Sequence, residues 1–313
     1  MKLSPVLLGL LASMLAGVAH AQVNTDLEQC RTISNNPDLA IRHCTAAIDS
    51  GKLSPRDRAQ AHLNRGVEWF NKNDYDRAIA DYDAALRIDP KLADGYHNRG
   101  SAWAHKGDPE RAISDFDSAL RLNPKDAGAL HARAVELTVK GDYARALADY
   151  DAALRLDPKA DDIAFSRART FFYSENYPRA VEEFEKAHKA SPTDYSAMWL
   201  YLARKRGGMA GAEDMLDEAT RASQRLGWPS AVIALYLGRT DLQSVMNAAT
   251  DANPGRQRDQ RCEANFYTAH WHLFQNAPER ALALLQEAER SCPKQFLEYE
   301  GTLAELRRLK KRQ

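Results

Sequence analysis

One pattern of small, aromatic and proline positions recurs four times between residues 59 and 194, at a fixed spacing and without an insertion. Each copy has an alanine, an aromatic residue four positions later, a second alanine after three more, and a proline after five more. The sets are Ala78, Tyr82, Ala85 and Pro90; Ala112, Phe116, Ala119 and Pro124; Ala146, Tyr150, Ala153 and Pro158; and Ala180, Phe184, Ala187 and Pro192. A fixed period of about 34 residues predicts a fold of stacked helical repeats.

Each copy predicts two helices joined by a polar turn. The four units are Ala59–Leu92, Ala93–Asp126, Ala127–Ala160 and Asp161–Asp194. The first helix has a small residue near its middle and a large one three positions later: Gly66 and Trp69, Gly100 and Trp103, Ala134 and Leu137, Ala168 and Phe171. The second helix contains the paired alanines, and the proline ends it because proline cannot continue a helix. The small residues allow the two helices to approach closely.

These positions resemble the signature of the tetratricopeptide repeat family. The resemblance rests on Gly66, Trp69, Ala78, Tyr82, Ala85, Pro90 and their equivalents in the other units. It implies an all-α fold, a right-handed solenoid of antiparallel helix hairpins with capping helices. It also implies a non-enzymatic scaffold that binds a protein or an extended peptide, and it names no partner.

The flanks of the regular units predict further helices. Residues 22–58 form a degenerate N-terminal repeat, in which Ala40, Cys44 and Ala47 reproduce the spacing of the second helix. Residues 195–261 form an irregular helical region, with helices expected at Tyr195–Arg206, Ala212–Arg225, from Ser230 to Leu237, and from Thr240 or Asp241 to about Asn253. The run Arg256–Arg261 is interpreted as a polar linker.

The repeat spacing returns near the C-terminus. Residues 262–295 form a final repeat-like unit, whose spacing rests on Ala281, Leu285, Ala288 and Pro293. Residues 296–313 are expected to form a capping helix, Phe296–Leu309, and a basic tail. The cations at this end are interpreted as a solvated helix terminus that complements the helix dipole, with attachment to an anionic surface as the alternative.

The C-terminal third is also similar to the NlpI-type envelope tetratricopeptide repeat lipoproteins. The similar runs are Ala197–Ala203, Trp228-Pro229, Leu235–Gly238 and Cys262–Tyr267. This similarity implies an adaptor of the bacterial cell envelope, linked to cell-wall hydrolases and able to form dimers. Val18 stands where those proteins have a lipidated cysteine, so no lipid anchor is expected.

Residues 1–21 read as a secretory signal peptide. Lys2 precedes a mostly apolar run from Val6 to Ala16, and Ala19-His20-Ala21 is a small-x-small cleavage site. The alternative is an uncleaved membrane anchor, but the run is shorter than the about 20 apolar residues that a bilayer needs. We therefore expect a periplasmic or secreted protein, cleaved after Ala21, with no integral membrane segment once the signal is removed.

Four cysteines follow the signal peptide, and an even number in an exported chain favours disulfides. Cys30 and Cys44 lie at equal distances from Pro37 in the sequence, so an antiparallel hairpin places them at the same height. Cys262 and Cys292 lie at equal distances from Ala277, at the open end of the last hairpin. We predict these two pairings, worth ~3 and ~3.7 kcal/mol by loop entropy.

The charges and motifs exclude several classes of function. Lys plus Arg and Asp plus Glu number 43 each, so nothing indicates nucleic-acid binding. Motifs for phosphate binding, zinc proteolysis or nucleophilic hydrolysis are missing, so neither an enzyme nor a cofactor is predicted. His97 and His131 have no third partner in the repeat, and His270 and His272 point to different helix faces, so no metal site is expected.

The first helices of the units line the concave groove in tetratricopeptide arrays, and they carry the candidate peptide-binding residues. Asn64 and Asn98 hold equivalent positions, and an asparagine amide can pair with a peptide backbone through a donor and an acceptor. An exposed polar position without a ligand is the alternative. The surrounding candidates are Gln60, His97, Ser101, His131, Arg169, Phe172 and Tyr173. For Phe172 and Tyr173, packing against the next repeat is the alternative, and it is favoured for one of them.

Two further interpretations concern repeated or aromatic positions. Arg65, Arg99, Arg133 and Arg167 recur at one position, and acids recur on the second helices at Asp81, Asp115, Asp149 and Glu183. We interpret them as structural pairs rather than as a ligand-binding stripe. The aromatic region from Trp199 to Trp228 suggests a homodimer contact through residues 195–228, in a self-associating structural component. An accessory subunit of an envelope or secretion complex is a third hypothesis.

Overall fold

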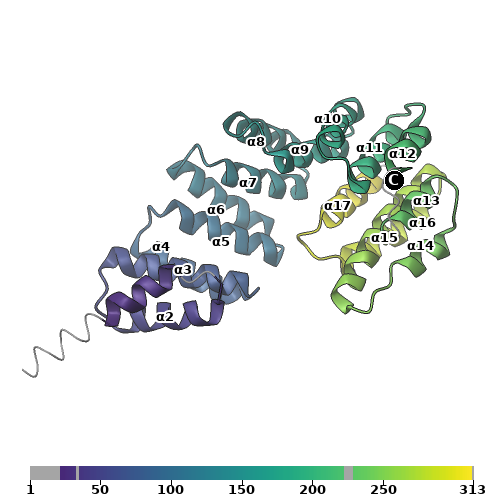
Figure 1. Ribbon diagram of the computed structural model, residues 1–313. Coiled ribbons are helices and arrows are strands. Elements are labelled where there is room, and N and C mark those ends of the chain that lie inside the picture. Colours follow the sequence, from purple (N-terminus) through teal and green to yellow (C-terminus); the bar gives the residue numbers. More distant parts are fainter. Residues whose placement is uncertain (1–21, 33–34, 222–227, 312–313) are drawn as a thin grey trace, which may run out of the picture. The chain divides into compact units, whose positions relative to one another are not determined.

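The computed structural model describes residues 22–32, 35–221 and 228–311, and every regular element in these ranges is a helix (Figure 1). The predicted signal peptide, residues 1–21, lies outside the described residues. The chain divides into two compact units. Unit 1 extends to Ala129 and unit 2 runs from Leu130, so the division falls within helix α7. Each unit is described by itself.

Unit 1 consists of successive antiparallel hairpins. A helix over residues 22–32 precedes the others. The following helices are α2 (Pro37–Asp49), α3 (Pro55–Asn71), α4 (Tyr75–Ile88), α5 (Ala93–Lys106) and α6 (Pro109–Leu122), and α7 (Ala127–Lys140) begins here. Neighbouring helices pack in the order α2, α3, α4, α5 and α6, as stacked repeats require.

Unit 2 continues the hairpins and then departs from them. Its regular helices are the rest of α7, α8 (Tyr143–Leu156), α9 (Asp161–Tyr173) and α10 (Tyr177–Ala190). They are followed by α11 (Asp194–Arg206), α12 (Ala212–Arg221), α13 (Ser230–Tyr236), α14 (Leu242–Ala248), α15 (Pro254–Phe274), α16 (Pro278–Ser291) and α17 (Leu297–Lys310). Thus α15 and α16 form the final hairpin predicted from the repeat spacing.

A short turn with the same chemistry joins the two helices of each regular unit. One residue in each turn has a positive φ, for example 60° at Asn73 and 77° at Gly107. The next residue then caps the second helix, because its side chain accepts a hydrogen bond from the backbone N–H three positions on. These caps are Asp74, Asp108, Asp142 and Asn176. The capping residues in the polar turns predicted from the sequence therefore set where each second helix begins.

The small residue of the first helix faces the aromatic residue of the second. A Cβ atom placed at Gly66 would lie 2.6 Å from Cε1 of Tyr82, so no larger residue fits there without a shift of the ring. The four aromatic residues at the Tyr82 position are at most 1% exposed. The small residue lets the two helices approach closely, and the aromatic ring fills the space between them. Both positions repeat because they form one contact.

The predicted polar linker at Arg256–Arg261 is wrong, because these residues form the first turns of α15. The Asn253 side chain accepts hydrogen bonds from the backbone N–H groups of Gly255 and Arg256, and Pro254 occupies the first turn. Proline is compatible with a helix start, where its missing N–H is not needed. The turn residues therefore begin a helix rather than separate two.

Helix α17 does more than end the array. Besides its predecessor α16, it packs against α15 and against α9, which lies far earlier in the chain (Figure 1). Its buried residues include Glu298, Glu300 and Glu305, so the helix is enclosed on several sides. The expected capping helix is therefore an internal element of unit 2.

Candidate functional site

Repeated ion pairs hold the first helix of each regular unit against the second. Nη2 of Arg65 lies 2.8 Å from Asp81, and Nη2 of Arg99 lies 2.7 Å from Asp115. The same pairing joins Arg133 to Asp149 and Arg167 to Glu183, at 2.7 and 2.6 Å. Each acid is buried. The structural interpretation of this arginine series is confirmed, and the pairs fix the orientation of the first helices that carry the candidate binding residues.

The candidate peptide-binding residues of unit 1 lie on α3 and α5. Gln60 Nε2 donates a hydrogen bond to Asn64 Oδ1 over 2.9 Å, so this contact uses the acceptor of the Asn64 amide and not its donor. These two residues, with Arg31 and Arg56, line a hollow of about 420 Å³. Asn98 is half-buried, and its side chain has no hydrogen-bond partner among the residues that the structure describes. Both asparagines therefore keep donors for a ligand.

The other two candidates of unit 1 also lie on α5. The His97 ring packs edge-on against Phe116, and Nδ1 lies 3.7 Å from a carboxylate oxygen of Asp126. Ser101 donates a hydrogen bond to the backbone oxygen of His97 within the same helix. Both side chains are half-buried. Gln60, Asn64, His97, Asn98 and Ser101 together are called the unit 1 face below.

The candidates of unit 2 have a different environment. His131 is half-buried beside Ser166, and burial lowers the pKa of its ring. Arg169, Phe172 and Tyr173 are 1%, 2% and 6% exposed, so a ligand cannot reach these three side chains. Phe172 packs edge-on against Trp199 and Tyr177. The packing alternative therefore holds for both aromatics, where the sequence favoured it for one.

Helix α17 covers this part of α9. Arg169 Nη1 lies 3.1 Å from Glu300 Oε2, and the two side chains are 2% and 5% exposed. A Cβ atom at Gly301 would lie 3.0 Å from the hydroxyl of Tyr173, so the helices are in close contact. The α9 positions predicted to bind a peptide are thus occupied by the chain's own helix.

A second arginine anchors the C-terminal end of α17. Arg307 donates to the backbone oxygens of Val139 and Thr138 over 2.5 and 3.3 Å. These carbonyls lie in the last turn of α7, and that of Thr138 also accepts a hydrogen bond from the backbone N–H of Gly141 over 2.9 Å. A cation is favourable there, because the helix dipole is negative at this end. The basic end of α17 therefore fastens it to α7, and Arg307 is not the solvated residue that the sequence suggested.

Two tetratricopeptide repeat family models match the chain, one over residues 69–136 and the other over residues 34–93 and 131–195. The chain belongs to the tetratricopeptide repeat family. The matches together cover residues 34–195 without a gap, which includes the degenerate second helix near Cys44. The expected all-α tetratricopeptide fold is confirmed.

Solved structures with this fold extend the likeness. A tetratricopeptide repeat protein from Parabacteroides merdae is 17% identical with a TM-score of 0.58, over 91% of this chain and 98% of that one. PilF from Pseudomonas aeruginosa is 16% identical with a TM-score of 0.48, over 80% and 100%. The first tetratricopeptide repeat domain of Spaghetti (RPAP3), bound to an HSP90 peptide, is 24% identical with a TM-score of 0.36, over 37% and 91%. At these identities the likeness concerns the fold alone.

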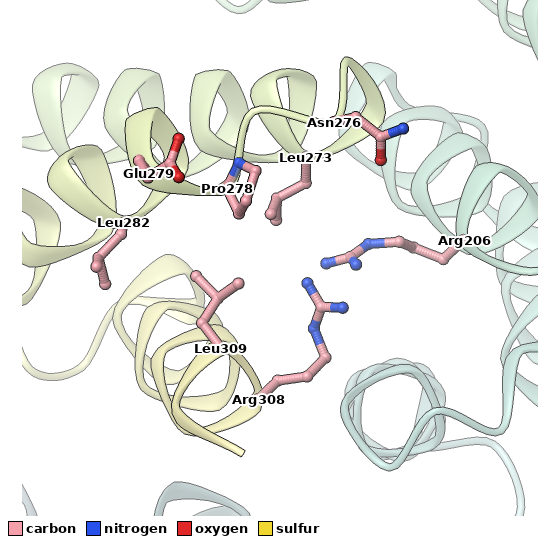
Figure 2. Close-up of a pocket in the computed structure, with 8 residues that line it drawn as sticks. All are labelled: Arg206, Leu273, Asn276, Pro278, Glu279, Leu282, Arg308 and Leu309. Atoms are coloured by element: carbon pink, nitrogen blue, oxygen red, sulfur yellow. The ribbon is translucent and has the colours of Figure 1, made fainter. Parts of the chain in front are cut away.

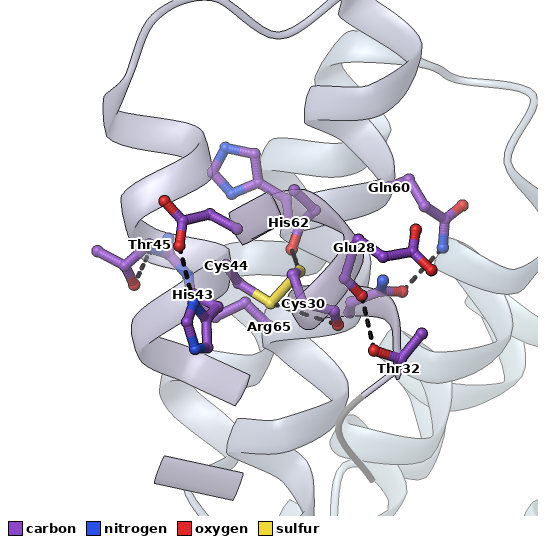
Figure 3. Close-up of a disulfide and its surroundings, with 12 residues drawn as sticks. Glu28, Cys30, Thr32, His43, Cys44, Thr45, Gln60, His62 and Arg65 are labelled. Carbon is purple, nitrogen blue, oxygen red and sulfur yellow. Dashed lines mark hydrogen bonds and ion pairs between the residues drawn. A yellow bond between two sulfur atoms is a disulfide. The ribbon is translucent and has the colours of Figure 1, made fainter. Parts of the chain in front are cut away.

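Both predicted disulfides are present in this tetratricopeptide protein. Cys30 bonds to Cys44 between the helix at 22–32 and α2, and Figure 3 shows this disulfide beside His62 and Arg65 of α3. Cys262 bonds to Cys292, joining α15 to the end of α16. All four residues are buried. Each disulfide therefore closes a hairpin, the first in unit 1 and the second in unit 2.

The aromatic residues proposed for a homodimer contact lie inside unit 2. Trp199 and Tyr201 of α11 are 0% and 3% exposed and pack against other rings of the core. Trp228 donates a hydrogen bond to Glu263, which also accepts one from Tyr195. Trp199 and Tyr201 fill the core where the regular repeat ends and are not available to a second copy of the chain, whereas Tyr195 is 36% exposed and Trp228 is half-buried.

Metal-ligand clusters and membrane-spanning helices are both absent from the described part of the tetratricopeptide chain. Residues 22–32, 35–221 and 228–311 contain no group of three or more histidine, cysteine and acidic side chains that could hold a metal ion. Across the same ranges, no helix combines the length and apolar character needed to cross a bilayer. His270 and His272 are buried at 0% and 6% exposure.

His270 predicts a measurable pH dependence. Neither of its ring nitrogens has a hydrogen-bond partner among the described residues, and burial lowers its pKa from 6.5 to about 3. The folded state therefore resists protonation, and its stability falls by about 1.4 kcal/mol per pH unit as the pH drops below 6.5. Burial raises the pKa of Glu298 to about 7, which opposes this loss between pH 7 and 4.5.

A His270→Leu variant isolates the histidine, since Glu298 is common to both proteins. Relative to the natural chain, the variant should gain about 2.7 kcal/mol of unfolding free energy when the pH is lowered from 7 to 4.5. Urea unfolding at the two pH values measures the difference. A gap between the two proteins that stays constant with pH would contradict the buried, neutral state of His270.

Sequence reasoning missed the polar residues that join α17 to the rest of unit 2. Glu300 and Arg307 hold it to α9 and α7, and Glu305 pairs with Arg206 of α11. No tetratricopeptide position predicts these pairs, because they join segments that the repeat period does not relate. The one available signal was the spread of acidic residues along α17. Because of these acids, the helix has no purely apolar face to bury in the core.

Proposed function

We propose that this protein is a non-catalytic adaptor of the bacterial cell envelope that binds a partner protein or an extended peptide on the unit 1 face. Tetratricopeptide arrays are interaction scaffolds, and their first helices present the ligand-binding side. The observation that carries the proposal is the contrast between the first helices. Asn64 and Asn98 keep unpaired amide donors, whereas the equivalent region of α9 lies under α17.

The chemistry of the unit 1 face suits a peptide backbone. An asparagine amide offers a donor and an acceptor, so it can pair with a peptide group without reading the side chains. The two asparagines hold the same position in successive repeats, which spaces their amides along the array. At the hollow near Asn64, Arg56 adds positive charge, whereas Arg31 is paired with Asp57 over 2.7 Å. An extended segment with an acidic residue near its end fits this arrangement.

The proposed location rests on the leader and on the disulfides. The signal peptide predicted at residues 1–21 would direct the chain out of the cytoplasm. Two disulfides that close hairpins persist in an oxidising compartment and support this placement. The resemblance of the C-terminal third to NlpI-type adaptors makes a cell-wall hydrolase our first candidate partner.

Site-specific photocrosslinking in the native periplasm tests this function. A photoreactive residue at Asn98 should capture one specific protein, identified by mass spectrometry. The matched control places the same residue at Ser114, which is exposed on α6 and lies on a second helix. The same set of captured proteins at both positions, or none at Asn98, would refute binding through the unit 1 face.

A binding measurement then assigns the contact to the asparagines. With the captured partner in hand, the double variant Asn64→Ala and Asn98→Ala should weaken binding by about tenfold or more, since each lost amide pair is worth about 1 kcal/mol. Its thermal unfolding should change little, because Asn64 loses only the half-buried hydrogen bond that it accepts from Gln60, and Asn98 has no side-chain hydrogen bond within the described residues to lose. Unchanged affinity would move the binding surface elsewhere.

A further inference from the structure

A hollow in unit 2 shares no residue with the unit 1 face, and the inference drawn from it is independent of the proposed function. It has a volume of about 340 Å³, within the range of small-ligand pockets. Figure 2 shows its lining, which comes from α11, from α15, α16 and the turn between them, and from α17: Arg206, Leu273, Asn276, Pro278, Glu279, Leu282, Arg308 and Leu309.

Two arginines share one buried carboxylate at this hollow. Arg206 Nη2 lies 2.6 Å from Glu305 Oε2, and Arg308 Nη2 lies 2.7 Å from the same oxygen. The arginine side chains are 10% and 8% exposed, and that of Glu305 is 5% exposed. Two buried cations against one buried anion leave an excess positive charge. Glu279 also lines the hollow, but it is exposed to water and screened.

The guanidinium groups are directed into the hollow. Figure 2 shows those of Arg206 and Arg308 turned toward each other at its centre. Nε of Arg206 is buried and has no hydrogen-bond partner among the described residues. A guanidinium has five donors in a planar fork that matches a carboxylate, and one shared acid does not satisfy two such forks. Buried donors of this kind call for a further acceptor.

The rest of the lining is apolar. Leu273, Leu282 and Leu309 point into the hollow on the side away from Arg206 (Figure 2). Burying a short aliphatic group against them is favourable because it removes apolar surface from water. The hollow therefore has a cationic side and an aliphatic side.

We propose that this hollow binds a carboxylate that carries a short aliphatic group. The carboxylate pairs with Arg206 and Arg308, and the aliphatic group packs on Leu273, Leu282 and Leu309. Two sources have this chemistry: the C-terminal residue of a polypeptide that ends in leucine, and a free aliphatic acid. We refer to the site as the carboxylate pocket.

Matched ligands test the carboxylate pocket with the natural full chain after signal removal. Calorimetric titration with N-acetyl-leucine and with hexanoate should detect binding with a Kd of about 1 mM or tighter for at least one of them. The corresponding amides lack the negative charge and should bind at least tenfold more weakly. Binding of N-acetyl-leucine alone identifies a polypeptide C-terminus as the source, and binding of hexanoate alone identifies a free acid. No binding of either acid, or equal binding of acids and amides, overturns the proposal.

Variants then locate the binding. Arg206→Gln should weaken binding of the acid identified in the titration by at least tenfold. In this variant Glu305 keeps Arg308 as its partner. The control is Arg204→Gln on the same helix, because Arg204 pairs with Glu185 and does not line the hollow. If the glutamine variant fails to fold, Arg206→Lys is used instead, because it keeps a positive charge beside Glu305. It should still weaken binding, because lysine lacks the planar fork of guanidinium donors. Equal affinity in Arg206→Lys and in the natural chain would place the ligand elsewhere.

Discussion

Replacing Glu300 by alanine lowers the free energy of unfolding of unit 2 by about 4 kcal/mol, because it leaves the Arg169 guanidinium buried without its partner. Both side chains are within the core, at 2% and 5% exposure. Burial raises the pKa of the Glu300 carboxyl, and the neighbouring arginine opposes that rise. Removing the carboxylate therefore exposes the full cost of a buried cation, which is among the largest effects of a single substitution.

Hydrogen exchange measures this effect where it occurs. Amides of α9 and α17 should exchange much faster in Glu300→Ala, since the pair joins these two helices. Glu287→Ala is the control, because Glu287 pairs with Arg290 on the exposed surface of α16 and should contribute less than about 1 kcal/mol. Adding Arg169→Leu to the Glu300 variant should recover part of the loss. Equal exchange in the two single variants would contradict the anchoring role of Arg169 and Glu300.

Removal of the Cys262–Cys292 disulfide is the second large effect. The two cysteines are 30 residues apart, and their bond closes the α15–α16 hairpin at its open end. A double Cys262→Ala and Cys292→Ala variant should lose about 3.7 kcal/mol by the loop-entropy estimate. Part of this loss appears as opening of α16, because the bond ties Cys292 at the end of α16 to the buried Cys262 of α15.

The other disulfide provides the matched control. A double Cys30→Ala and Cys44→Ala variant opens a shorter loop, with a sequence separation of 14, and should lose about 3 kcal/mol, confined to unit 1. Limited proteolysis with mass spectrometry distinguishes the two variants by the position of the first cleavages. In the Cys262→Ala and Cys292→Ala variant, early cleavage near α2, or no increase in cleavage of α16, would contradict the assignment of one disulfide to each unit.

The repeat could be predicted from the sequence because each of its contacts is local. Gly66 meets Tyr82, and Arg65 meets Asp81, within one helical hairpin. The cysteine pairings followed from the same geometry, since equal distances from a turn bring two residues to one height. The repeat contacts recur at a fixed period, and the paired cysteines lie at equal distances from a turn. Both patterns can therefore be read as a spacing of residues in the sequence.

The candidate site could be predicted only in part. The positions of Asn64 and Asn98 follow from the repeat, and they remain candidates for peptide binding. The assignment of Arg169, Phe172 and Tyr173 to an accessible groove did not anticipate α17. The Arg256–Arg261 run was interpreted as a linker from its polarity, although the capping residue Asn253 and the proline after it start a helix. Polarity alone does not separate an exposed helix from a loop.

The sequence by itself determined the tetratricopeptide fold, the turns and the two disulfides, because all of these depend on short separations along the chain. The tertiary structure decided which first helices remain accessible, through the return of α17 to α9. It also decided that Arg206 and Arg308 share Glu305 at one hollow. Such contacts join helices that are far apart in the chain, and they depend on the shape that the stacked helices reach, which no local spacing records.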